Sequence, residues 1–134
     1  MIFIFSSCVT ENEFNTEYLY TIRNDSDYDL SIIGFSNNIE TKRISIPSNE
    51  LYQESIYGNG TDNTSIAIRI LESDSVKIIY DNIKFDVFKC SFENNTECFS
   101  SGSPFNSTNL GNSYTVTIDN EDYENAKDCN GHCE

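Results

Sequence analysis

The sequence predicts an all-β protein, built as a single antiparallel β-sandwich with a short C-terminal helix. Three observations lead to this fold class. After residue 17, apolar and polar residues alternate with the period of two that a half-buried strand requires. Clusters of Asn, Asp, Ser and Gly separate the alternating runs and have the chemistry of turns. Between most of these runs there is no helical pattern that would connect parallel strands, so antiparallel neighbours are expected.

Each alternating run ends at a turn or a breaker. The predicted strands cover residues 18–23, 28–35, 42–46, 51–56, 65–71, 76–80, 83–88 and 114–118. In the second run Tyr28, Leu30 and Ile32 share one face, and in the third Ile44 and Ile46 point inward. A proline ends the third run because it cannot donate to a strand ladder, and the fourth stops at the Gly-Asn-Gly of residues 58–60.

The clearest hairpin prediction lies in the middle of the chain. Asp81 and Asn82 tolerate the positive φ angles of a tight turn, and β-rich runs flank them. Residues 65–71 are predicted to form a strand, with a buried helical segment as the alternative, because short apolar runs fit both. The residues expected to share a face within each hairpin strand are Val76, Ile78 and Tyr80, and then Ile83, Phe85 and Val87.

The C-terminal part combines a long loop, a last strand and a helix. Residues 91–112 are rich in Asn and Ser and are predicted to be a loop. Asp119 is expected to cap a helix over residues 120–127, with acidic residues near its start and Lys127 near its end. Trp is absent and the cysteines do not frame a core strand pair, so the antibody-type pattern is missing. The expected sandwich is immunoglobulin-like or transthyretin-like.

Length and charge limit the function classes. The chain has 134 residues, enough for one domain with its own core. Its formal net charge of -14 repels phosphate backbones, so nucleic-acid binding is not expected. No apolar run reaches the ~20 residues that a membrane-spanning helix requires.

Cys8 follows a short apolar stretch and two serines. The motif Phe-Ser-Ser-Cys at residues 5–8 resembles a bacterial lipobox, in which the cysteine carries lipid. In this interpretation residues 1–7 are the remainder of a signal peptide, residues 8–17 are a lipidated flexible tether and residues 18–134 are the sandwich domain. The alternative is an ordinary first strand at residues 1–5 with Cys8 as a buried thiol. We favour lipidation because residues 9–17 are polar and acidic, as in a solvated tether.

Cys90, Cys98, Cys129 and Cys133 form an even set in the C-terminal half, which favours two disulfides in an exported protein. Local closure of Cys90 with Cys98 and of Cys129 with Cys133 needs no long-range assumption, but all three pairings stay open. The alternative is a zinc site of Cys129, His132 and Cys133 completed by one of the other cysteines. The Cys-x-x-Cys spacing of a zinc knuckle is absent from the sequence, so no metal is expected.

Asp25, Asp27 and Asp29 follow the alternate-position rhythm of oxygen ligands in a calcium loop. Leu30 and Ser36 stand where such a loop has glycine and glutamate. A turn that enters a strand explains the same residues, and calcium is kept as the weaker alternative.

An enzymatic activity is not expected. His132 is the one histidine in the sequence, and no Ser or Cys motif supplies a nucleophile to pair with it. Glycine motifs that cradle phosphates are also absent from the sequence, and no cofactor is expected.

Several segments, taken in order, resemble small uncharacterised lipoproteins of Bacteroidetes. They are the motif at residues 5–8, the strand and turn at 18–26, the hairpin at 74–82, the strand at 114–118 and the acidic segment at 121–123. The resemblance covers most of the chain. It implies an outer-membrane lipoprotein of the cell envelope, periplasmic or surface-exposed, and supplies no activity.

The leading functional hypothesis is a non-enzymatic cell-envelope lipoprotein that binds another protein or a glycan through loops of a rigid scaffold. Under this hypothesis residues 58–63 and 91–112 form the contact surface. One alternative is an immunity or inhibitor protein whose acidic surface attracts a basic toxin. Another is a glycan-binding accessory lipoprotein. The oligomeric state stays open.

Overall fold

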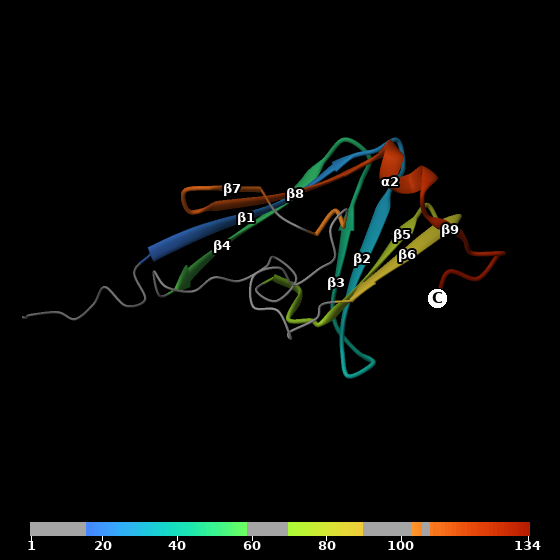
Figure 1. Cartoon of the computed structure of the whole chain (residues 1–134), viewed down its shortest axis with the longest axis horizontal. Helices are drawn as coiled ribbons and strands as arrows, with labels where there is room; N and C mark the ends of the chain where they lie inside the picture. The colour runs from blue at the N-terminus through green and yellow to red at the C-terminus, as the bar shows by residue number, and fades with distance from the viewer. Residues whose placement is uncertain (1–15, 59–69, 90–102, 106–107) are drawn as a thin grey trace, which may run out of the picture.

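The computed structural model describes residues 16–58, 70–89, 103–105 and 108–134. These residues form two β-sheets and one short helix, so the predicted all-β sandwich is confirmed (Figure 1). In chain order the elements are β1 (Thr16–Asp25), β2 (Leu30–Ser36), β3 (Ile39–Ile46), β4 (Leu51–Gly58), β5 (Ser75–Tyr80), β6 (Lys84–Lys89), β7 (Thr108–Leu110), β8 (Ser113–Asp119), α2 (Asn120–Glu124) and β9 (Lys127–Asp128).

The two sheets have the strand orders β4-β1-β8-β7 and β3-β2-β5-β6-β9. The chain changes sheet between β1 and β2, β3 and β4, β4 and β5, β6 and β7, and β8 and β9. β1 pairs with β4 in one sheet while β2 pairs with β5 in the other, the same interlocked arrangement as strands B–E and C–F of an immunoglobulin sandwich. In Figure 1 the sheets lie close together at the end that carries α2 and diverge away from it.

One strand pair departs from the predicted antiparallel pattern. β1 and β8 are parallel, with Leu19 opposite Ser113 and Asp25 opposite Asp119. Parallel neighbours need a long crossover connection, and the segments that separate β1 from β8 supply it. Strand alternation alone carries no information about this direction.

The core lies between the inner faces of the two sheets. The expected inward faces of β2, β3 and β5 are confirmed, since Ile32, Ile44 and Ile78 all belong to one buried cluster. The aromatic members of this cluster are Tyr18, Tyr20, Tyr80 and Phe105. Ile70 and Leu71 are helical and buried in the same cluster, so the helical alternative holds for them, whereas residues 65–69 lie outside the described residues.

The face that Ile83, Phe85 and Val87 were expected to share, along β6, is the outer face of the second sheet. Phe85 lies opposite Ile79, and both belong to a second apolar cluster on that outer face. Ile83 and Val87 are 50% and 42% exposed there. Phe88, at the alternate position, packs against the main core instead.

α2 begins as predicted and ends earlier. Asp119 accepts a hydrogen bond from the Asp122 amide, and the Asp122 side chain accepts one from the Asp119 amide, which completes a capping box. The prediction that the helix reaches Lys127 is wrong. Lys127 lies in β9 opposite Phe85, and the neighbouring Cys129 amide donates to the Ile83 carbonyl, so pairing with β6 replaces a further helical turn.

The predicted tether, Cys8, Cys90, Cys98 and the loop at residues 59–63 lie outside the described residues, except that β1 already begins at Thr16 within the expected tether. In the described part of the chain no helix has the length and apolar character needed to cross a membrane.

Candidate functional site

Strand directions bring most of the described acidic turns to one end of the sandwich. β1, β3, β5 and β8 end there, and β2, β4 and β6 begin there. We call this end the acidic tip. It contains the turns β1–β2, β3–β4 and β5–β6, together with residues 119–128. Its carboxylates are Asp25, Asp27, Asp29, Glu50, Asp81, Asp119, Glu121, Asp122, Glu124 and Asp128.

Three tyrosines from three elements meet at the tip. The rings of Tyr28 and Tyr123 stack with centroids 3.7 Å apart, and the Tyr80 ring meets Tyr123 edge-on at 5.6 Å. Lys84 places its Nζ atom 4.6 Å from the centroid of the Tyr123 ring, a distance at which the ring quadrupole attracts a cation. Burial, then the hydrogen bond with Tyr123, and then the charges of Asp27 and Asp81 raise the pKa of Tyr28.

The Tyr80 hydroxyl is buried beneath this cluster. It has no hydrogen-bond partner among the residues that the structure describes. Burial and then the charges of Asp122, Asp86 and Asp119 raise the pKa of Tyr80 far above its ordinary value. Asp122 is itself half-buried, and burial raises its pKa to about 6.

The three aspartates of the calcium hypothesis contact different partners and do not converge on one site. Asp27 and Asn120 exchange two hydrogen bonds, which join the β1–β2 turn to the start of α2. Asp29 accepts from the Ser48 amide and donates its own amide to Asp81, while Asp25 lies 3.6 Å from Arg23. No group of three His, Cys, Asp or Glu side chains in the described ranges could hold a metal ion.

Asn24 holds the β1–β2 turn of the tip through buried hydrogen bonds. The alternation of apolar and polar residues in the sequence does not reveal this role. Asn24 is fully buried, and its Nδ2 donates to the Tyr28 carbonyl at 2.7 Å and to the Ile46 carbonyl at 2.9 Å. Its Oδ1 accepts from the amide and the hydroxyl of Ser26, which is buried as well. One side chain therefore fixes the β1–β2 turn and ties β1 to β3 in the opposite sheet.

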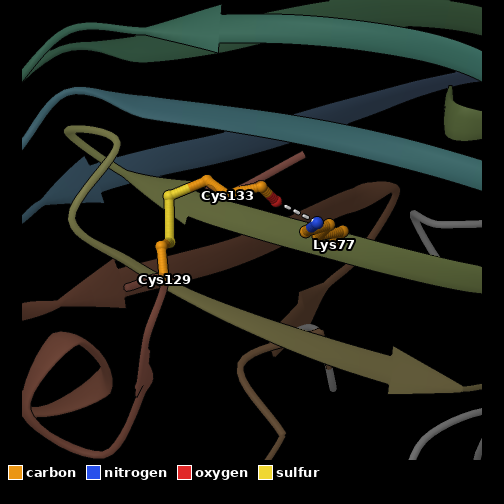
Figure 2. Close-up of a disulfide and its surroundings, with 3 residues drawn as sticks. All are labelled: Lys77, Cys129 and Cys133. Atoms are coloured by element: carbon orange, nitrogen blue, oxygen red, sulfur yellow. Dashed lines mark hydrogen bonds between the residues drawn. A yellow bond between two sulfur atoms is a disulfide. The ribbon is translucent and has the colours of Figure 1, made fainter. Parts of the chain in front are cut away.

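The C-terminal tail folds back on the outer face of the second sheet. Cys129 and Cys133 form a disulfide with their Cα atoms 4.7 Å apart. The disulfide packs on Ile33 and Ile79, and Lys77 donates from its Nζ to the Cys133 carbonyl (Figure 2). The local pairing is thus present for these two cysteines.

The zinc alternative fails for Cys129 and Cys133, because the disulfide leaves neither sulfur as a thiolate ligand. His132 is exposed in the same loop. Cys90 and Cys98 lie outside the described residues.

A second polar cluster closes the gap between the edge strands β3 and β4. Lys42 lies 3.1 Å from Glu54, and the Tyr52 hydroxyl donates to the same carboxylate at 2.8 Å. Burial raises the pKa of Glu54, but the hydrogen bonds from Tyr52 and Lys42 outweigh it and the net pKa is lowered. This cluster joins the two sheets.

Comparison with protein-family models, with curated proteins and with solved structures found no match. The geometry of the tip is therefore what indicates a function. Asp25, Asp27 and Asp29 were predictable as candidate site residues from their spacing, whereas the tyrosine cluster was not. The cluster comes from a turn, a strand and a helix that are far apart in the chain, and no local pattern links them.

Proposed function

We propose that the protein is a non-enzymatic cell-envelope lipoprotein, anchored through Cys8, that binds a basic partner protein with its acidic tip. The single observation that carries the proposal is the direction of β1. This strand starts at Thr16, within the last two residues of the proposed tether, and ends at Asp25 in the tip. A lipid at Cys8 would therefore hold the opposite end of the sandwich near the membrane and leave the tip facing away from it.

The loops first expected to form the contact surface attach at the membrane-facing end in this arrangement. β4 ends at Gly58 opposite Thr16, and β6 ends at Lys89 opposite Ser75, at the end of the sheets remote from the tip. We therefore assign the contact surface to the acidic tip instead of to residues 58–63 and 91–112.

Charge indicates the class of partner. The tip gathers carboxylates from four separate segments, and the whole chain has a net charge of -14. A surface of this kind speeds the capture of a basic protein by electrostatic steering, with a strong dependence on ionic strength. The hydrogen bonds of Asp27 and Asp29 hold the turns in place, so little ordering is needed on binding.

A second candidate is an inhibitor or immunity protein for a basic toxin. The many carboxylates at the acidic tip favour this candidate, because complementary charge raises the rate at which such an inhibitor associates with its toxin. A glycan-binding role has less support at the tip, since Tyr28 and Tyr123 stack on each other and are half-buried instead of offering a flat exposed ring.

Site-specific photocrosslinking in intact cells tests the proposal. A crosslinking amino acid at Asn125, exposed in the tip, is compared with one at Tyr57, 63% exposed at the remote end of β4. We expect a basic protein to be captured from Asn125 and not from Tyr57. Capture from Tyr57 alone would contradict the assignment of the tip.

Charge-matched variants complete this test. The tip variant replaces Glu50, Glu121 and Glu124 by Gln, and the control replaces Glu17, Glu40 and Glu72 by Gln at the remote end. The tip variant should lose about tenfold of the crosslinked product while the control keeps it. Equal losses would mean that net charge, and not the tip, attracts the partner.

A further inference from the structure

The tyrosine cluster at the tip already holds one cation. The Lys84 ammonium lies 4.6 Å from the centroid of the Tyr123 ring, and the lysine is half-buried at the start of β6. The opposite face of the Tyr123 ring is covered by Tyr28, and the Tyr80 ring lies against it edge-on. The cluster is therefore built to favour a positive group at a defined place.

The Tyr80 hydroxyl is a second, independent sign of a ligand. Tyr80 is 0% exposed, and its oxygen has no hydrogen-bond partner within the described residues. Buried hydroxyls nearly always have one. Tyr80 lies directly opposite Lys84 in the β5–β6 hairpin, so both side chains leave the same face of the sheet, and both lie against the Tyr123 ring.

Arginine fits the cluster better than lysine does. A guanidinium is planar, stacks on an aromatic face and carries five donors in a fixed fork, whereas an ammonium is a compact charge with a tightly held hydration shell. The carboxylates of Asp119 and Asp122 lie close enough to Tyr80 to raise the pKa of its hydroxyl, so they add negative charge beside the cluster.

We infer that the tip recognises an arginine side chain of its partner, which stacks on Tyr123 in the place that Lys84 occupies in the free protein. The inference rests on the proposed function, because it names the chemical group by which the tip reads a basic partner. Lys84 is then a built-in competitor whose removal opens the site.

Calorimetric titration of the 134-residue chain carrying Cys8→Ser with a hexa-arginine peptide tests the inference, with hexa-lysine as the comparison. We expect hexa-arginine to bind about tenfold more tightly at equal salt, because both peptides carry the same charge but only one stacks well. Equal affinities of the two peptides would overturn the inference.

Two lysine variants sharpen the test. Lys84→Gln and Lys127→Gln each remove one positive charge from neighbouring strands of the tip. Lys84→Gln should raise the affinity for hexa-arginine about fivefold more than Lys127→Gln does, since only Lys84 lies over the ring. Equal effects of the two variants would show attraction by charge alone and would refute a site on the ring.

Tyr123 variants test the ring itself. Tyr123→Leu keeps apolar bulk without a π face and should abolish the preference for arginine, while Tyr123→Phe should keep it. Urea unfolding shows whether each variant folds. If Tyr123→Leu does not fold, Tyr28→Leu replaces it in the test, because it removes the ring that stacks on Tyr123. A folded Leu variant that retains the preference would overturn the inference.

The failure of this inference is distinguishable from the failure of the proposed function. The peptide titrations use the purified chain without lipid, so an error about Cys8 does not affect them. Conversely, crosslinking of a basic partner at Asn125 with no arginine preference in the titrations would leave the tip as the contact surface and remove the arginine site.

Discussion

At the scale of single residues, a few buried polar side chains decide the shape of the tip. Asn24 donates to the Tyr28 carbonyl in the β1–β2 turn and to the Ile46 carbonyl of β3, and it accepts from Ser26, so it replaces the water that these groups would bind in an unfolded chain. Buried groups of this kind contribute little net stability when satisfied, but leaving their partners unsatisfied is expensive.

Replacing Asn24 by Ala should therefore lower the free energy of unfolding by about 2–3 kcal/mol, because two carbonyls and the amide and hydroxyl of Ser26 each lose one hydrogen bond inside the protein. Urea denaturation monitored by circular dichroism measures the change. Asn49→Gly is the control, since Asn49 is exposed with a φ of 62°, and glycine adopts that conformation without strain. A loss below 0.5 kcal/mol for Asn24→Ala, about the spread of neutral surface changes, would contradict this role.

Asp122 makes the stability depend on pH. Its pKa is raised to about 6 in the folded protein from an ordinary value of 3.8, chiefly by burial. The folded state thus binds this proton more tightly, and the resulting stability is fully present below pH 3.8 and is lost as pH rises through about 6.

Asp122→Asn should remove this dependence while its amide oxygen still accepts from the Asp119 amide. The variant should gain stability relative to the native chain between pH 4 and 7, by about 1 kcal/mol once partial exposure is taken into account. Thermal unfolding at several pH values measures it. Stability profiles that run parallel across this range would show that Asp122 does not titrate as described.

At the scale of elements, local chemistry explains the turns better than it explains the long connections. The hairpin of β5 and β6 was predictable because Asp81 and Asn82 accept left-handed backbone, and both have positive φ, 49° and 56°. The strand faces followed from alternation. The end of α2 and the parallel pairing of β1 with β8 did not, because each depends on contacts made by distant segments.

The same hairpin offers a graded test of turn strain. Asn82→Gly should raise the free energy of unfolding by about 0.5 kcal/mol, and Asn82→Val should lower it by about 1–2 kcal/mol, since β-branched residues resist positive φ. Urea denaturation of both variants gives the order. A valine variant as stable as the native chain would be inconsistent with a left-handed conformation at this position.

The disulfide of Cys129 and Cys133 holds the tail on the outer face of the second sheet. Replacing both cysteines by Ser should lower the free energy of unfolding by about 2 kcal/mol, the chain-entropy value for so short a loop. It should also expose Ile33 and Ile79 to a fluorescent apolar dye. Glu134→Gln, which weakens only the exposed pair with Arg43, is the control and should change stability by less than 1 kcal/mol. Unchanged dye binding in the double variant would show that the tail stays in place without the bond.

At the scale of the whole molecule, β1 connects the two parts of the functional argument. The strand runs from the proposed tether to the acidic tip, so the proposed anchor and the proposed contact surface lie at opposite ends of one strand. The sequence predicted the anchor from the residues around Cys8 and the acidity from composition. Only the strand pairings show that the acidic turns β1–β2, β3–β4 and β5–β6 and the segment at residues 119–128 share one end.

The most direct test of this account is mass spectrometry of the N-terminus of the protein isolated from its native cells. The account predicts a mature chain that begins at Cys8 with acyl groups on it and is recovered from the membrane fraction. An acyl-free chain that still carries residues 1–7 and is recovered from the cytosol would contradict it.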